Sequence, residues 1–438
     1  MKKTLFCESL GCPKNRVDSE VIIAQFLENG WEVTEKPEKA RLIILNTCSF
    51  INDAREESVS RFFDLHAAMA DGAKIAMTGC LPQLYPNIGR ELREADFIIG
   101  IDEIPRFREL VESNWLVGYK GKIGDPSFLY TSKMSRSSTL SPFTAYLKIA
   151  DGCNNFCSFC SIPYIRGRYR ERGIDDIVTE AKALVAGGIR EIVLIAQDTT
   201  QYGTKHDSSL AELLKKINEI EGNFRFRTMY LYPSGIDDDL LKLIRDLDKM
   251  YNYLEIPIQH ISDRVLKSMN RRYTGRDIYN LIERINRIFG DNYLLRTTLL
   301  SSFPTETKAD HEELKSFISH DFFDYGGVFK YSKEEVSASG KLRAVPAKTA
   351  KERFDEVNAL LHESLERRLS RFVGSECEML YEGIDGELSV PTGRCWNQAP
   401  EIDGITIVTN ADDKNFGTLR KCRIVSREGA DFIADFVK

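Results

Sequence analysis

Three cysteines in one short run give the strongest chemical signal in the sequence. Cys153, Cys157 and Cys160, which we call the loop trio, form a C-x₃-C-x₂-C run. Three thiols this close converge on one inorganic centre only if the backbone wraps around it. A structural zinc site needs a fourth ligand and usually has paired C-x₂-C knuckles, which this run lacks. A 4Fe–4S cluster with three cysteine ligands leaves one iron open for a substrate or cofactor, so an iron–sulfur site is favoured over three buried loop thiols.

Three further cysteines lie far apart in the sequence but in equivalent positions. Cys12, Cys48 and Cys80, which we call the sheet-edge trio, each come just after an expected strand. The carboxyl ends of parallel strands meet at one edge of a sheet, so these thiols are predicted neighbours. They form a second three-thiolate site, again one ligand short of closure. The alternative is that these three cysteines follow strands by chance.

The remaining cysteines show no metal-like spacing. Cys7 lies inside an expected strand, where a thiol packs as a small hydrophobe. Cys377, Cys395 and Cys422 are interpreted as core residues of the last domain. No export signal is recognised, because Glu8 interrupts the first apolar run. The ten cysteines are therefore expected to be reduced, in a cytoplasmic protein.

The elements that position the sheet-edge trio alternate between strand and helix. Strands are predicted at 4–7, 41–45, 73–77 and 97–99, and helices at 18–28 and 54–70. This alternation predicts an α/β fold with a doubly wound parallel sheet over residues 1–124. Residues 125–141, rich in Ser, Thr, Lys and Arg and without periodicity, are predicted to form a linker.

A second alternation positions the loop trio. The predicted strands are 146–150, 191–196, 226–232, 253–258, 293–300 and 327–331, and the helices between and after them are 174–185, 210–220, 238–247, 264–269, 278–288 and 311–318. Six units are fewer than the eight of a closed barrel, so a partial, open (β/α)₆ barrel is predicted. Cys153 follows its first strand, at the end where such barrels bind ligands.

The last part of the chain changes character. Residues 350–372 have the spacing of a charged amphipathic helix, which ends a central domain predicted over 139–372. Short strands are predicted at 376–381, 387–390, 404–409 and 420–427, and they indicate a small antiparallel β-barrel over 373–438. From Gly374 onward there are 12 acidic and 7 basic residues, a net charge of −5.

Composition excludes several classes of protein. With 42% apolar and 29% charged residues among 438, the chain is that of a globular protein and disorder is excluded. No apolar run approaches the ~18 residues of a membrane span, so no membrane association is expected. The net charge of −6 disfavours non-specific nucleic-acid binding, which depends on Lys and Arg.

These features together resemble a known family. The loop trio, with Phe159 before its last cysteine, is similar to the signature of radical S-adenosylmethionine enzymes. The sheet-edge trio resembles the amino-terminal domain of their methylthiotransferase branch, and the acidic tail resembles the TRAM module of those proteins. Segments 9–15, 196–203 and 256–260 are similar to the members that methylthiolate an aspartate of small-subunit ribosomal protein uS12. The transfer-RNA-modifying relatives usually carry a Tyr-Gly-Cys-Gln-Met-Asn type of segment at the first cysteine.

The resemblance implies a cofactor set and a mechanism. Each trio would hold one 4Fe–4S cluster. The loop-trio cluster would chelate S-adenosylmethionine, whose reductive cleavage yields a radical that removes a hydrogen from the aspartate β-carbon. That C–H bond is barely acidic, so no side-chain base could remove the proton. The sheet-edge cluster would carry the sulfur, and a second S-adenosylmethionine the methyl group. Phe159, Gln197 and Asp198 are expected near the cofactor, with strand-end capping and packing as the alternative, and no catalytic residue is expected beyond the cluster ligands.

Two segments depart from the family pattern. The family usually shows Gly-Phe-Pro-Gly-Glu-Thr, whereas residues 302–307 read Ser-Phe-Pro-Thr-Glu-Thr. Ser302 and Thr305 thus replace glycines, and we expect strain there if the backbone needs glycine-only angles. Segment 334–337, Glu-Glu-Val-Ser, lacks the glycine expected after the paired glutamates.

Three functions compete: methylthiolation of uS12, methylthiolation of a transfer-RNA adenosine derivative, and a non-catalytic iron–sulfur scaffold or electron carrier. The last does not explain a six-unit barrel with a cysteine loop at its mouth. A barrel that grips RNA should be basic, whereas a net charge of −5 suits a basic ribosomal protein. The expected partners are uS12 and an electron donor, with RNA contact secondary. The basic segments 166–170 and 271–272 are interpreted as solvated surface, with contact to RNA or to a substrate carboxylate as the alternative.

Overall fold

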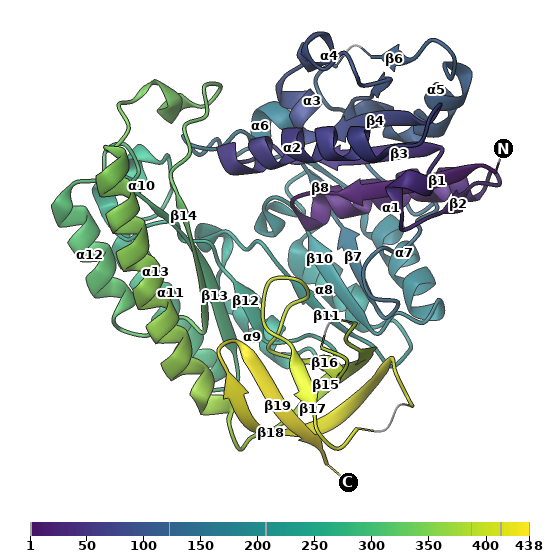
Figure 1. The fold of residues 1–438 in the computed structure, drawn as a ribbon. Coiled ribbons are helices and arrows are strands. Elements are labelled where there is room, and N and C mark those ends of the chain that lie inside the picture. The colour runs from purple at the N-terminus through teal and green to yellow at the C-terminus, as the bar shows by residue number, and fades with distance from the viewer. Residues whose placement is uncertain (1, 122, 206–207, 387, 412–413, 438) are drawn as a thin grey trace. The chain divides into compact units, whose positions relative to one another are not determined.

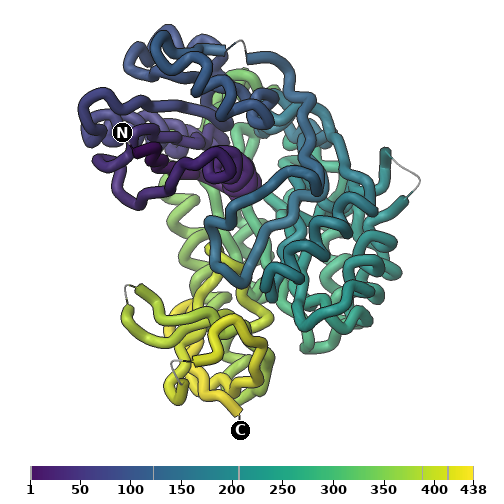
Figure 2. Tube along the Cα trace, turned by 90° about the vertical axis from the view of Figure 1, so that its right-hand side faces the viewer, coloured from purple at the N-terminus to yellow at the C-terminus, as the bar shows by residue number. Residues whose placement is uncertain are grey.

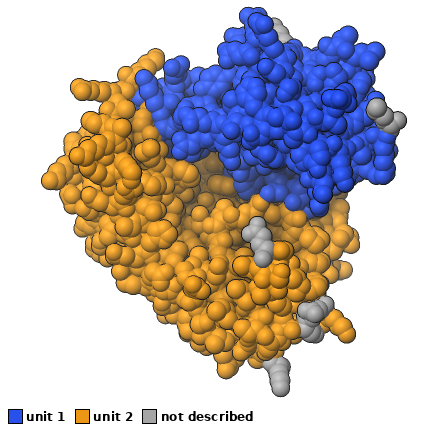
Figure 3. Space-filling view, in the orientation of Figure 1, with its two compact units in different colours: residues 1–139, 150–172, 332–340 blue, residues 140–149, 173–331, 341–438 orange. Residues whose placement is uncertain are grey.

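The computed structural model describes residues 2–121, 123–205, 208–386, 388–411 and 414–437 (Figure 1). The chain divides into two compact units, which Figure 3 colours separately. Unit 1 comprises residues 1–139, 150–172 and 332–340, and unit 2 comprises 140–149, 173–331 and 341–438. Both predicted cysteine trios therefore belong to unit 1.

In its described residues, unit 1 is built on a six-stranded parallel sheet of order β2-β1-β3-β4-β5-β6 (Figure 1). The strands are β1 (Thr4–Ser9), β2 (Glu32–Val33), β3 (Leu42–Thr47), β4 (Lys74–Gly79), β5 (Phe97–Ile98) and β6 (Tyr119–Lys120). Every residue of β3 is buried, as its apolar run predicts for a central parallel strand. The strand order reverses between β1 and β3, and ligands of such sheets bind outside the carboxyl ends at this reversal. The predicted parallel sheet is confirmed.

Helices and turns complete unit 1. Its helices are α1 (Pro13–Leu27), α2 (Asn52–Ala68), α3 (Cys80–Leu84), α4 (Ile88–Glu91), α5 (Phe107–Ser113) and α6 (Ile162–Ile165), with 3₁₀ turns η1 (Pro37–Lys39), η2 (Ile101–Arg106) and η5 (Ala338–Lys341). A short antiparallel pair, β8 (Ala150–Asp151) with β9 (Arg170–Glu171), closes the segment that carries the loop trio. The sequence did not predict β2, β6 or α3 to α5, because two to seven residues are too few to show a period.

The predicted linker is irregular, but up to Thr139 it is packed against α1. Glu20 on α1 accepts a hydrogen bond from the Thr139 backbone N–H at 3.1 Å and pairs with Arg136 at 2.6 Å. Tyr130 donates its hydroxyl to Asp18 on the same helix. Two buried acidic residues of α1 thus fix a segment whose composition suggested a free connection.

Unit 2 begins with parallel strands in two three-stranded sheets, β7-β10-β11 and β12-β13-β14. The strands are β7 (Thr144–Lys148), β10 (Glu191–Ile195), β11 (Arg225–Thr228), β12 (Tyr253–Glu255), β13 (Leu294–Ser301) and β14 (Tyr325–Lys330). A parallel bridge between Phe226 and Met250 joins the two sheets. The predicted open set of six parallel strands is confirmed.

Helices alternate with these strands. They are α7 (Ile174–Ala186), α8 (Leu210–Asn218), α9 (Asp238–Asp246), α10 (Asp263–Ser268), α11 (Gly275–Phe289) and α12 (Lys308–Ile318), with turns η3 (Thr199–Gln201) and η4 (Pro233–Gly235). Several begin at the side-chain caps that their sequences favour, such as Thr274 with Asp277 at α11. Among the helices of the described residues, none is both long and apolar enough to cross a bilayer.

Unit 2 ends in a long helix and a small barrel. Helix α13 (Ala347–Leu369) and turn η6 (Ser370–Phe372) precede β15 (Glu376–Ile384), β16 (Pro391–Cys395), β17 (Thr406–Val408), β18 (Thr418–Glu428) and β19 (Asp431–Phe436). The five described strands close in the order β15-β16-β17-β19-β18. Figure 2 draws this last part of the chain in yellow. The barrel is not wholly antiparallel as predicted, because β17 and β19 pair in parallel. A ring with an odd number of strands cannot alternate direction at every step, so one parallel pair is required.

Candidate metal centres

The sheet-edge trio lies at the carboxyl ends of three adjacent strands. Cys12 follows β1 and precedes the first residue of α1, Cys48 follows β3 directly, and Cys80 follows β4 as the first residue of α3. Cys48 and Cys80 are buried, and Cys12 is partly exposed. The structure therefore brings together three thiols that are 36 and 32 residues apart in the sequence.

Asn15, in the first turn of α1, connects the three loops that carry these thiols. Its amide nitrogen donates to the carbonyl oxygen of Leu10 at 3.0 Å and to that of Thr47, beside Cys48, at 2.9 Å. The Cys80 thiol lies 3.5 Å from its amide oxygen. Because Asn15 is fully buried, these bonds have no competition from solvent, and one side chain sets the spacing of the trio.

Two glycines allow these loops to approach each other. Gly11 has φ +88°, and an added Cβ there would lie 2.7 Å from both Cβ and Sγ of Cys48. Gly79 has φ +93°, and an added Cβ would overlap the Asn46 amide oxygen and the Thr47 carbonyl. A side chain at either position would push one of the three cysteines away from the others.

The loop trio lies on the connection between β8 and α6. Cys153, Cys157 and Cys160 are all partly exposed. The backbone N–H of Cys153 donates to Gly167 across the loop at 3.2 Å, and that of Cys160 donates to Cys157 at 3.0 Å. These bonds fold the loop back between Cys153 and Gly167 and make a turn between Cys157 and Cys160.

A left-handed residue and two contacts fix the shape of this loop. Phe156, in the middle of the run, has φ +49°, a left-handed conformation that costs about 1–2 kcal/mol in an L-residue. The Arg168 guanidinium lies 4.3 Å from the centroid of its ring and helps to hold it there. From the far end of unit 1, Ser339 donates its N–H to the Ser158 carbonyl at 2.7 Å.

Arg166 extends from the loop-trio segment to the sheet-edge trio. Six residues past Cys160, its side chain is 2% exposed and lies 2.7 Å from Asp18 and 3.5 Å from Asp151. Its other terminal nitrogen donates to the Asn15 amide oxygen and lies 3.8 Å from Sγ of Cys80. The interpretation of segment 166–170 as solvated surface is therefore wrong for Arg166, because buried carboxylates from two distant segments draw the guanidinium inward.

The electrostatic environment of the sheet-edge trio depends on this arginine. Burial raises the pKa of the Cys80 thiol to about 12, against the positive charge of Arg166, and the neighbouring thiols of Cys48 and Cys12 raise it further. Burial likewise raises the pKa of Cys48. Burial opposes the charge on Arg166 itself, but the carboxylates of Asp18 and Asp151 and the adjacent thiols raise its pKa well above the usual value. Arg166 thus remains a fixed cation beside thiols that ionise only when a metal replaces their protons.

Both trios fit an iron–sulfur cluster better than a single metal ion. Among the described residues, neither forms a group of ligand atoms within 4.8 Å of one another, the spacing that one ion requires. In a 4Fe–4S cluster each thiolate binds a different iron, so wider spacing is expected. Unpartnered hydroxyls also lie next to both trios in the described part of the chain: those of Ser49, beside Cys48, and Ser161, beside Cys160, are fully buried. Each can donate to a sulfide or thiolate of a bound cluster.

The other predicted cofactor contacts lie in different units, Phe159 in unit 1 and Gln197 and Asp198 in unit 2. Phe159 lies partly exposed within the loop trio. In unit 2, Gln197 and Asp198 follow the carboxyl end of β10. Asp198 accepts hydrogen bonds from the backbone N–H of Thr200 at 3.0 Å and from Gln201 at 2.9 Å, which caps η3. The capping alternative is therefore realised for Asp198, and the cofactor contact stays a prediction.

The structure shows how the two segments that depart from the family pattern fold. Ser302 has φ +62°, and its backbone N–H donates to the Glu306 carboxylate at 2.7 Å, so the left-handed turn is kept without glycine. Thr305 is not among the described non-glycine residues with positive φ. Ser337 donates its hydroxyl to the Glu334 carbonyl at 2.8 Å, which closes the turn without the missing glycine.

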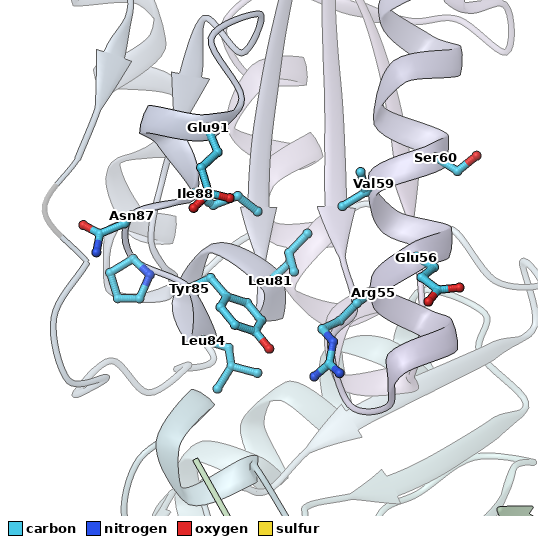
Figure 4. Close-up of a pocket in the computed structure, with 11 residues that line it drawn as sticks. Arg55, Glu56, Val59, Ser60, Leu81, Leu84, Tyr85, Asn87, Ile88 and Glu91 are labelled. Atoms are coloured by element: carbon cyan, nitrogen blue, oxygen red, sulfur yellow. The ribbon is translucent and has the colours of Figure 1, made fainter. Parts of the chain in front are cut away.

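Unit 1 also has an open cleft between α2 and the segment α3 to α4 (Figure 4). Arg55, Leu84 and Tyr85 lie around its mouth, and Arg55 also pairs with the buried Glu334. The cleft is lined by residues 55–60 of α2 and by residues between Leu81 and Glu91, and neither trio contributes to it. It is therefore a surface feature beside the sheet-edge trio.

Comparison with known proteins identifies the class. Residues 147–318 match the model of the radical SAM superfamily, residues 4–100 match uncharacterized protein family UPF0004, and residues 373–437 match the TRAM domain. A solved radical S-adenosylmethionine methyltransferase, TsrM from Kitasatospora setae, has a similar fold, with a TM-score of 0.54 and 14% identity over 78% of this chain and 77% of that protein. The chain is a radical SAM enzyme.

Curated relatives narrow this assignment. Proteins named ribosomal protein uS12 methylthiotransferase RimO are 38% identical in Geobacter sulfurreducens, over 100% of this chain and 99% of the relative, and 42% identical in Caldicellulosiruptor saccharolyticus, over 91% and 92%. The relative of that name in Aquifex aeolicus is 38% identical over 95% and 93%. The chain belongs to the RimO family of radical SAM methylthiotransferases.

Proposed function

We propose that this chain methylthiolates the β-carbon of an aspartate in ribosomal protein uS12, with one 4Fe–4S cluster on each cysteine trio. The observation that carries the proposal is that both trios lie in one compact unit and that Arg166, six residues past Cys160, reaches Cys80 of the sheet-edge trio. A cluster on the loop trio would, when bound with S-adenosylmethionine, supply hydrogen abstraction, and a cluster on the sheet-edge trio would supply sulfur. The chain's own residues supply the placement of these two centres.

Asn15 and Arg166 have the central roles in this placement. Asn15 holds the loops of the sheet-edge trio at fixed spacing, and Arg166 ties the loop-trio connection to Cys80. A cluster on three thiolates carries net negative charge, so the buried guanidinium would stabilise it. Radical transfer to sulfur requires that the two clusters stay at a constant separation. The buried ion pairs of Arg166 with Asp18 and Asp151 are suited to hold this separation.

The charge of the C-terminal barrel supports a protein substrate. Its net charge of −5 favours encounter with a strongly basic ribosomal protein and disfavours RNA. One of its basic side chains, Arg423 on β18, is already paired with Glu376 at 2.6 Å. We therefore place uS12 before a transfer RNA as the substrate, and we expect the reaction in the cytoplasm with an unidentified electron donor.

A strain that lacks the gene tests the proposal. Mass spectrometry should show uS12 without its methylthio group and an unchanged set of transfer-RNA nucleosides. Plasmid-borne wild type and Cys7→Ala should restore the modification, whereas Cys153→Ala should not. Loss of a methylthiolated nucleoside while uS12 is unaltered would establish the transfer-RNA function instead.

A further inference from the structure

Three cysteines of the C-terminal barrel meet in space, although their sequence spacing predicts no site. Cys377 is on β15, Cys395 ends β16 and Cys422 is on β18. The Sγ atom of Cys377 lies 3.3 Å from that of Cys395 and 3.7 Å from that of Cys422, and the last two are 3.7 Å apart. We call this group the barrel trio.

The strand register produces this meeting. Cys377 lies directly opposite Cys422 in the antiparallel pair of β15 with β18. Cys395 lies opposite Met379 in the pair of β15 with β16, two residues from Cys377 and so on the same face of the sheet. The three side chains therefore point to the inside of the barrel from three neighbouring strands.

The spacing of the barrel trio is that of ligands around a single ion. A tetrahedral metal with metal–sulfur bonds of about 2.3 Å places its thiolates about 3.8 Å apart. Among the described residues, this is the one group of three His, Cys, Asp or Glu ligand atoms that all lie within 4.8 Å of one another. Hydrogen bonds between neutral thiols are the alternative, since the 3.3 Å contact of Cys377 with Cys395 also suits an S–H···S bond.

The surroundings suit a bound cation. Cys395 and Cys422 are buried in the barrel core, while Cys377 is partly exposed and leaves a route for an ion to enter. The Thr406 hydroxyl lies 3.3 Å from Sγ of Cys395, within reach to donate to a thiolate. The net negative charge of the barrel adds to the attraction.

We propose that Cys377, Cys395 and Cys422 bind one thiophilic metal ion, Zn²⁺, as three thiolates, with a solvent molecule as the fourth ligand on the side of Cys377. Three thiolates and one open position are a coordination set that Zn²⁺ accepts, and soft thiolates select Zn²⁺ or Cu⁺ over harder ions. Binding releases the thiol protons and connects β15, β16 and β18. The site would therefore stabilise the barrel, independently of the two trios of unit 1.

Metal content of the full-length protein tests the proposal. The protein is reconstituted anaerobically with iron and sulfide, incubated with Zn²⁺, separated from free metal and analysed for zinc. Wild type and the Cys7→Ser control should retain one zinc per chain more than Cys377→Ser, whose altered side chain is at the partly exposed edge of the site. In competition with a chelator, the wild type should keep its zinc at a chelator concentration that leaves none on Cys377→Ser.

A second measurement needs no variant. Iodoacetamide labelling of Cys377 in the wild type, followed by peptide mass spectrometry, should slow at least tenfold when Zn²⁺ is present. A parallel incubation with Cu⁺ distinguishes the ions: retention of Cu⁺ but not Zn²⁺ by the same thiols keeps the site and changes the metal. Equal zinc in wild type and Cys377→Ser with unprotected labelling, or a Cys377–Cys395 disulfide in anaerobically purified protein, would overturn the proposal.

Discussion

The guanidinium of Arg166 lies 3.8 Å from Sγ of Cys80, although the two residues are 86 positions apart in the sequence. The loop that carries Cys153, Cys157 and Cys160 thus supplies a buried cation to a thiol at the edge of the amino-terminal sheet. The same guanidinium pairs with Asp18 and Asp151. One arginine therefore links the stability of unit 1 to the electrostatics of a predicted cluster site.

Replacement of Arg166 by Met removes this cation and keeps the volume of the side chain. We expect a loss of about 3–5 kcal/mol in the free energy of unfolding, because the buried carboxylates of Asp18 and Asp151 lose their partner. Iron bound at the sheet-edge trio should fall as well. Denaturant unfolding and iron analysis of the reconstituted protein measure both effects. The exposed Arg168 is the control, and a change to Met there should alter unfolding by less than about 1 kcal/mol. Equal effects of the two changes would contradict the role of Arg166.

Gly11→Ala should disrupt the sheet-edge trio. The new Cβ would lie 2.7 Å from Cβ and Sγ of Cys48, so the loops that carry Cys12 and Cys48 must separate. We expect iron after reconstitution to fall from about eight to about four per chain. Gly30→Ala is a matched control, since Gly30 has a similar φ of +78° but no atom within 4 Å of an added Cβ. Full iron in both variants would show that close approach at Gly11 is not needed.

The two trios should hold iron independently. Anaerobic reconstitution should give about eight irons per chain, and replacement of Cys153, Cys157 and Cys160 by Ala should leave about half. Replacement of Cys12, Cys48 and Cys80 should remove the other half, while Cys7→Ala should change nothing. Iron and sulfide assays with electron paramagnetic resonance of the reduced samples measure this. An iron count that does not change in the loop-trio variant would exclude the two-cluster proposal.

The parts of this molecule that follow from the order of strands could be predicted from the sequence. Alternating apolar strands and amphipathic helices predicted the parallel sheet of unit 1 and the open set of six parallel strands of unit 2. Parallel strands also placed Cys12, Cys48 and Cys80 at one edge. This succeeds because, in a parallel sheet, the end of a strand is fixed by chain direction alone. The exact register of the strands is not required.

The parts that depend on register or on long-range pairing could not be predicted. The barrel trio forms only because Cys377 faces Cys422 across an antiparallel pair, and irregularities near Tyr381 and Ile424 shift the register in a way the sequence does not reveal. Arg166 lies in a run of basic residues that suggests a solvated surface. Only the fold shows that Asp18 and Asp151 meet its side chain, and the sequence around Asp18, which is mostly polar, gives no signal of this.

A buried carboxylate in unit 2 predicts a dependence of stability on pH. Glu191 at the start of β10 pairs with Arg227 on β11 at 2.7 Å and with Arg394 on β16 at 2.6 Å, and all three side chains are buried. Burial raises the pKa of Glu191, but the two arginines outweigh it and the net pKa is lowered. The folded state thus holds the charged form more strongly than the unfolded state. Its contribution is complete above the unfolded glutamate pKa of about 4.3 and is lost as the pH falls through the lower folded value.

Glu191→Gln should reveal this contribution. At pH 7 we expect a loss of about 3–5 kcal/mol in the free energy of unfolding of unit 2, because the buried Arg227 loses its carboxylate partner and Arg394 keeps only Glu382. The difference from wild type should shrink at pH values below about 4, where the carboxyl of the unfolded wild type takes up a proton, followed at lower pH by that of the folded state. Urea unfolding at pH 7, 5 and 3.5 measures it. Glu376→Gln, which breaks the exposed pair with Arg423, should cost less than about 1 kcal/mol at every pH. If the loss in Glu191→Gln were the same at pH 7 and 3.5, the effect would come from altered packing and not from the charge on Glu191.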